Sequence, residues 1–167
     1  MNAMQMAESK LSLTAGHQYN GFSELLDIAT QKEIGFPKGI SAFEDYQQFN
    51  FRKEPRLKPF IYMHSTVDSN VSFVCVDPFI LNPSYQVELP DDSVKRLQLK
   101  NAEDLIVLCL VSVGRDMYTT TANLMSPIVI NPQTQKGEQV IMENMGMDFL
   151  RFNVWNSIGY NSTVIAK

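Results

Sequence analysis

The feature that most constrains the fold of this 167-residue chain is an unbroken apolar run at residues 105–111. Continued to Val113, the segment is rich in β-branched residues, which favours a central strand buried on both faces. It is the longest apolar run in the chain, and it is much shorter than the ~18 residues that a membrane-spanning helix needs. The sequence therefore predicts one globular domain built around a buried strand, with no membrane span.

Two β-hairpins are predicted on either side of this strand. Residues 60–64 and 71–76 are apolar and β-prone, and the polar segment Asp68-Ser69-Asn70 lies between them. Residues 126–131 and 138–143 flank a polar loop that contains a proline and a glycine. Short strands separated by polar turns are typical of antiparallel hairpins.

Helix signals are few. Residues 90–97 begin with acidic and end with basic side chains, an order that suits the helix dipole. Residues 22–29 fit two patterns, because Leu25, Leu26 and Ala29 have helical spacing while Leu26 and Ile28 alternate with Asp27 as in a strand. Together these signals predict an all-β (mainly β) fold, a small barrel-like, strongly twisted sheet with one or two short helices.

Charge and cysteine content narrow the function classes. The net charge is −4, which disfavours direct binding to the phosphate backbone of nucleic acids. Cys75 and Cys109 lie within apolar runs, and residues 1–10 have neither the basic start nor the apolar core of a secretory signal. We therefore expect buried, reduced thiols and a cytoplasmic protein.

The sequence contains no recognisable catalytic or metal motif, so no catalytic residue, metal or cofactor is expected. His17 lies in a polar N-terminal stretch, and His64 lies at the end of a predicted strand. Cys75 with His64 as its base is one enzymatic hypothesis, but the valines beside Cys75 favour a buried, unreactive thiol. Two pairs of adjacent acids, Asp91-Asp92 and Glu103-Asp104, could suggest a two-carboxylate enzyme, but capping at the start of a helix or strand explains them.

Three predicted loops carry unusual apolar content: residues 36–43, 77–83 and 121–128. Apolar loop residues either fold back to close a barrel end or form a surface on which a partner docks. Both interpretations are compatible with the pattern.

These segments, in this order, resemble the flagellar assembly factor FliW family. The resemblance rests on the following motifs: Phe36-Pro37-x-Gly39-Ile40-x-x-Phe43-Glu44, Val76-Asp77-Pro78-Phe79, and Thr121-Ala122-Asn123-Leu124-x-x-Pro127-Ile128-Val129-Ile130-Asn131. It covers about residues 11–143. We expect residues 1–10 to form a flexible extension, and residues 144–167 form a longer C-terminal tail than the family pattern leads us to expect.

The resemblance implies a non-enzymatic, barrel-like protein that binds and antagonises the translational regulator CsrA. It also implies that the protein binds flagellin, with the two partners in competition, so that flagellin synthesis is coupled to filament assembly. It further favours a strand over a helix for residues 25–28. The alternatives to this regulatory and chaperone role are a small-ligand-binding β-barrel and an enzyme that uses Cys75 or paired acids.

The apolar loops supply the candidate partner-binding residues, which are Phe36, Ile40, Phe43, Phe79, Asn123, Leu124, Met125, Pro127 and Ile128. Asn123 has two competing roles. Its side chain could offer a donor and an acceptor to the backbone of a partner, or it could bond to the backbone of its own turn, as turn asparagines commonly do. The tail carries Phe149, Phe152 and Trp155. We expect it to pack on the domain or on a second copy of the chain, which would form a homodimer.

Overall fold

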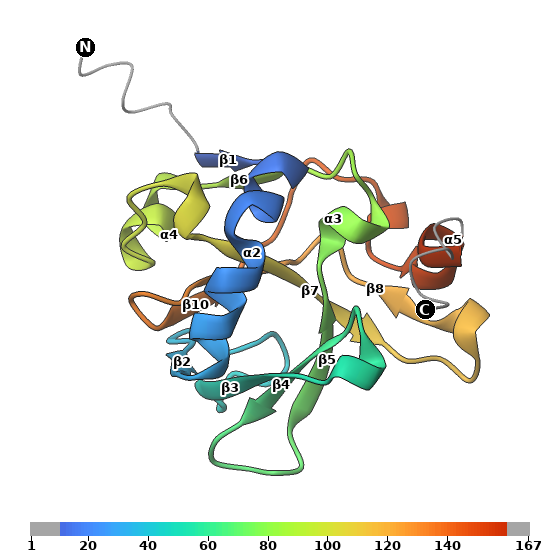
Figure 1. Cartoon of the computed structure of the whole chain (residues 1–167), viewed down its shortest axis with the longest axis horizontal. Helices are drawn as coiled ribbons and strands as arrows, with labels where there is room; N and C mark the ends of the chain where they lie inside the picture. Colours follow the sequence, from blue (N-terminus) through green and yellow to red (C-terminus); the bar gives the residue numbers. More distant parts are fainter. Residues whose placement is uncertain (1–10, 160–167) are drawn as a thin grey trace.

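The computed structural model describes residues 11–159 as one mainly β domain (Figure 1). Its strands are β1 (Leu11–Leu13), β2 (Glu33–Gly35), β3 (Gln48–Lys53), β4 (Ile61–Ser65), β5 (Ser72–Val76), β6 (Val87–Leu89), β7 (Ile106–Ser112), β8 (Thr121–Ala122), β9 (Ile128–Asn131), β10 (Lys136–Gln139) and β11 (Phe152–Asn153). Its helices are α2 (Ala15–Thr30), α3 (Pro78–Leu81), α4 (Asp91–Arg96) and α5 (Val154–Gly159), with 3-10 turns η1 (Pro55–Leu57), η2 (Ala102–Asp104), η3 (Met117–Thr119) and η4 (Met147–Phe149).

The main sheet closes on itself as a barrel. Its strand order is β11-β8-β7-β5-β4-β3-β2-β10-β9, and β9 also pairs with β7, so the seven strands from β7 to β9 form a ring. The closing register places Ile106 opposite Ile130 and Leu108 opposite Ile128. Strands β1 and β6 form a separate two-stranded sheet. The predicted mainly β, barrel-like fold is confirmed.

Both predicted hairpins are present. Strands β4 and β5 pair antiparallel, with Ile61 opposite Cys75. Strands β9 and β10 also pair antiparallel, with Ile130 opposite Gly137. Burial alternates along β4, where Ile61, Met63 and Ser65 are buried, whereas every residue of β9 is buried.

Strand β7 is the central strand that its apolar run predicted, but only along its first half. Residues 106–109 are fully buried, and their side chains alternate between two separate apolar clusters. The other half runs outward into the turn before β8, and Val113 is 70% exposed. The predicted burial of the whole segment is therefore wrong at its C-terminal end.

Two apolar cores lie on opposite faces of β7 and β9. The barrel interior is filled by side chains that include Phe36, Phe49, Phe51, Met63, Cys75, Ile106 and Ile128. The outer core is covered by α3, β6 and α5 and includes Phe79, Tyr85, Val87, Val107, Cys109 and Val154. Burial on both faces explains why β7 carries no polar residue over its buried half.

Residues 25–28 lie in α2, so the strand interpretation favoured by the resemblance is wrong. Leu26 and Ala29 are buried against the barrel core, while Asp27 is exposed and forms an ion pair with Lys53. A helix that covers the sheet needs only one apolar stripe. Ile28, which suggested strand alternation, is only half-buried. Helix α4 begins with two acids and ends with two bases, as predicted.

The C-terminal segment packs on the domain as far as the structure describes it. Val154 and Ile158 of α5 are buried in the outer core, and β11 pairs with β8. The expected flexible extension at residues 1–10 and the end of the tail at residues 160–167 lie outside the described residues. Within residues 11–159, no helix combines the length and apolar character needed to cross a membrane.

Candidate protein-binding groove

Most of the side chains expected to contact a partner are instead packed inside the domain. Six are buried: Phe36, Ile40, Phe79, Leu124, Pro127 and Ile128. All of them except Pro127 belong to the two cores, because apolar loop residues here close the barrel and its outer layer. These six side chains are buried in this structure, and their role in partner binding stays a prediction.

The three remaining candidates reach the surface. Phe43 is 39% exposed and packs edge-on against Phe73, with ring centroids 5.1 Å apart. Met125 is half-buried. The Asn123 Oδ1 atom accepts hydrogen bonds from the backbone N–H groups of Met125 and Ser126, both at 3.1 Å. Asn123 therefore fixes its own turn, the local role left open by the sequence.

Two of the three apolar loops lie together. The Gln139 side chain accepts a hydrogen bond from the Ser41 N–H at 2.9 Å and donates one to the Ser126 carbonyl oxygen at 3.3 Å. These bonds join the loop at residues 36–43 to the loop at residues 121–128. In the third loop, Asp77 caps α3 by accepting from the Phe79 N–H at 2.9 Å, and Phe79 packs in the same outer core as Leu124.

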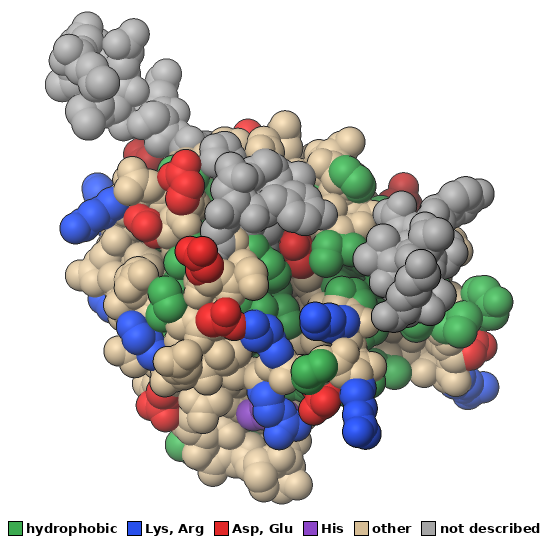
Figure 2. Space-filling view, in the orientation of Figure 1, with side chains coloured by type: hydrophobic (Ala, Val, Ile, Leu, Met, Phe, Trp, Pro, Cys, Tyr) green, Lys and Arg blue, Asp and Glu red, His purple; other side chains and the backbone are tan. Residues whose placement is uncertain are grey.

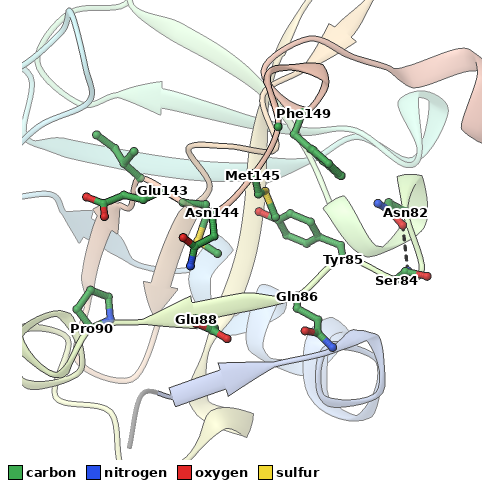
Figure 3. Close-up of a pocket in the computed structure, with 13 residues that line it drawn as sticks. Asn82, Ser84, Tyr85, Gln86, Glu88, Pro90, Glu143, Asn144, Met145 and Phe149 are labelled. Carbon is green, nitrogen blue, oxygen red and sulfur yellow. Dashed lines mark hydrogen bonds between the residues drawn. The ribbon is translucent and has the colours of Figure 1, made fainter. Parts of the chain in front are cut away.

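A surface groove lies beside the 121–128 segment. It has a volume of about 480 Å³ and runs between β6 and the segment at residues 141–149. Figure 3 shows β6 along one side and Glu143 and Asn144 on the other, with Tyr85, Met145 and Phe149 at one end. Its volume is within the range of small-molecule sites.

The groove is braced by the Thr-Ala-Asn-Leu segment. The Tyr85 hydroxyl donates to the Leu124 carbonyl oxygen at 2.7 Å, and the Leu124 N–H donates to the Phe149 carbonyl oxygen at 2.8 Å. The Met142 N–H donates to the Met125 carbonyl oxygen at 2.7 Å. Three groove-lining residues thus bond to the backbone of Leu124 and Met125, which supports the groove rather than forming its surface.

The groove combines adaptable apolar side chains with acidic ones. Met142 and Met145 line it, and methionine side chains adjust readily to different partners. Ile141 on its rim is 71% exposed. The charged side chains on the walls, within the described chain, are Glu88 and Glu143. This surface suits a protein segment that carries apolar and basic side chains.

The sequence contained one signal for this groove that our reasoning missed. Met142, Met145 and Met147 fall within six positions, and Met147 is 71% exposed. An accessible methionine-rich segment is typical of adaptable binding surfaces. The opposite wall comes from β6, more than fifty positions earlier, and no local pattern could pair the two.

The catalytic hypothesis that joined Cys75 to His64 finds no support in the geometry. Cys75 lies inside the barrel, and burial raises the pKa of its thiol to about 12. His64 pairs with Ser72, three positions from Cys75, and its ring stacks on Tyr62. Within residues 11–159, no group of three His, Cys, Asp or Glu side chains could hold a metal ion. The side chain of His17 lies outside those described.

Comparison with known proteins identifies the family. The family model described as FliW protein matches residues 20–150, which include the seven barrel strands and the residues that line the groove. This chain belongs to the FliW family. It is 33% identical over 136 residues to the flagellar assembly factor FliW of Caldicellulosiruptor saccharolyticus, covering 81% of this chain and 88% of that protein.

Further FliW proteins and a solved FliW structure are also similar to this chain. The flagellar assembly factor FliW of Moorella thermoacetica is 37% identical over 119 residues, which cover 71% of this chain and 75% of that protein. A crystal structure of the flagellar assembly factor FliW superposes with a TM-score of 0.65 at 32% identity, covering 70% of this chain and 81% of that chain.

Proposed function

We propose that this chain binds the translational regulator CsrA and antagonises it, and that it also binds flagellin as a chaperone. In this role, which needs no catalytic group, it couples flagellin synthesis to filament assembly in the cytoplasm. The observation that carries the proposal is the FliW family match across residues 20–150, together with relatives named flagellar assembly factors. The groove between β6 and residues 141–149 is the surface that we assign to partner binding.

Electrostatics supports a protein partner with basic side chains. The chain has a net charge of −4, and Figure 2 shows acidic side chains over β6, α4 and α2, with Lys and Arg also beside α4, while further Lys and Arg side chains gather over β3 to β5. Such an uneven distribution steers a partner of opposite charge and sets its orientation more than it adds affinity. Phe43 and Met125 are the sequence-derived candidates that remain accessible for further contacts.

The small-ligand barrel, the main alternative to this proposal, gains no supporting observation. The interior of the barrel is occupied by large side chains such as Phe36, Phe49 and Met63, each 0% exposed. A closed ligand cavity needs space at this position. The groove lies outside the barrel, on the other side of β7 and β9.

Size-exclusion chromatography of purified, nucleic-acid-free components tests the proposal. We expect the full chain to co-migrate with CsrA and, separately, with flagellin at micromolar concentrations. Migration of all three proteins as separate peaks would contradict the proposal. A Glu33→Lys variant is a matched control for charge variants of the groove, because Glu33 is exposed on β2 and does not line the groove.

A further inference from the structure

Strand β6 has one paired edge and one open edge. Within the part of the chain that the structure describes, it pairs with β1 alone, through Leu11 opposite Leu89 and Leu13 opposite Val87. Figure 3 shows β1 along one side of β6 and the groove along the other. Among residues 11–159, no backbone hydrogen bond joins β6 to residues 141–146 across the groove. The outward-facing backbone groups of β6 are therefore available to another strand.

The side chains of β6 allow another strand to pair with its open edge. Val87 and Leu89 point into the outer core and are 0% exposed, which anchors the strand. Gln86 and Glu88 are exposed and line the groove. A strand added to this edge would lie in the groove, and its side chains would alternate between the methionine-lined wall and the solvent.

The charges on the two walls select the chemistry of such a strand. Glu88 lies on β6 and Glu143 lies on the opposite wall, and none of the described residues that line the groove is basic. Asp91 and Asp92 follow directly after Pro90, which lines the end of the groove. An incoming segment with lysine or arginine at alternate positions meets carboxylates on both sides, whereas an acidic segment is repelled.

We propose that the groove binds an extended, basic segment of a partner protein, which adds to the open edge of β6 as a third strand of the β1–β6 sheet. Apolar side chains of the segment contact Met142 and Met145, and its lysine or arginine side chains pair with Glu88 and Glu143. This inference rests on the proposed function, because it specifies how the groove engages its partners.

A labelled seven-residue peptide that alternates lysine with valine tests this mode with the full chain, by fluorescence anisotropy. We expect saturable binding, at least tenfold weaker binding to the Glu88→Lys/Glu143→Lys variant, and no more than a twofold change for Glu33→Lys. The same peptide with glutamate in place of lysine should not bind. Equal binding of the basic and acidic peptides, or no binding of the basic peptide to the wild-type chain, would overturn the inference.

Two N-methylated forms of the peptide separate strand addition from simple charge attraction. One carries methyl groups on the odd-numbered amides and the other on the even-numbered amides, and a strand added at an edge uses only one of these sets. We expect one form to lose binding and the other to retain it, and slower hydrogen exchange within Val87–Leu89 when peptide binds. Equal effects of the two forms, with unchanged exchange, would overturn strand addition.

Failure of this inference can be distinguished from failure of the proposed function. Complexes with CsrA and flagellin that are unaffected by the groove variants would leave the proposed function standing and overturn this inference. Binding of the peptide in the expected pattern, without a complex with either protein, would overturn the proposed function alone.

Discussion

The hydroxyl of Tyr85 donates a 2.7 Å hydrogen bond to the backbone carbonyl oxygen of Leu124, 39 positions further along the chain. Both residues are almost fully buried, and burial strongly raises the pKa of the Tyr85 hydroxyl, which keeps its proton and remains a donor. This bond connects the floor of the groove to the most distinctive sequence motif of the chain. The motif therefore stabilises the groove by bonding to a residue that lines it.

Replacing Tyr85 with phenylalanine should destabilise the domain. Tyr85→Phe leaves the buried Leu124 carbonyl oxygen without this donor, and we expect the free energy of unfolding to fall by about 1–3 kcal/mol. Tyr118→Phe is the matched control, because Tyr118 is 72% exposed. Urea denaturation monitored by circular dichroism measures both variants. Equal stability of Tyr85→Phe and Tyr118→Phe would show that the bond contributes nothing.

Glu138 is a nearly buried carboxylate that ties α4 to the barrel. Arg96 donates to it at 2.7 and 3.1 Å, and the Ser93 hydroxyl donates to it at 3.1 Å. Lys38 lies 3.5 Å from it. Burial alone would raise the pKa of the Glu138 carboxyl. The hydrogen bonds and positive charge of Arg96, together with the charge of Lys38, outweigh burial, so the pKa of Glu138 is lowered.

The pH dependence of stability should reveal this carboxylate. Because its pKa is lower in the folded state, its contribution is complete above the ordinary value of 4.5 and is lost as pH falls below it. We expect Glu138→Gln to lower the free energy of unfolding by about 1–2 kcal/mol at pH 7, since Arg96 is partly exposed and screened. The difference from wild type should shrink at acidic pH. A constant difference from pH 7 to pH 3 would contradict the assignment.

Both thiols should resist labelling in the native state. Cys75 and Cys109 are free and buried, and burial raises the pKa of each above its ordinary value. Because the thiolate is the reactive form, we expect a polar thiol reagent to label neither at neutral pH, and to label both in denaturant. Mass spectrometry counts the labels. Rapid labelling of either native thiol would show that water reaches the core.

Local periodicity explains which parts of the fold could be predicted. The β4–β5 and β9–β10 hairpins bring together residues close in sequence, so their apolar runs and polar turns were sufficient. Strand β7 was predicted from its continuous apolar run, which reflects burial of its first half on both faces. Helix α2 was not, because its contacts with β3 and β7 decide its conformation and its own residues fit two periods.

The groove could not be predicted because its parts meet only after the barrel forms. Apolar residues in loops suggested a contact surface, yet Leu124 and Ile128 are buried in the two cores. Sequence alone does not separate a side chain that closes a core from one that meets a partner. The hydrogen bonds of the Leu124 backbone reveal the difference, since they point to the groove beside it.

The central claim is that partners of this FliW family member bind at the groove between β6 and residues 141–149. Titration calorimetry of CsrA against the wild-type chain, the Glu88→Lys/Glu143→Lys variant and the Glu33→Lys control tests it most directly. We predict saturable wild-type binding, at least tenfold weaker binding by the groove variant, and control affinity within twofold of wild type. Absence of wild-type binding, or equal affinity for all three chains, would contradict the claim.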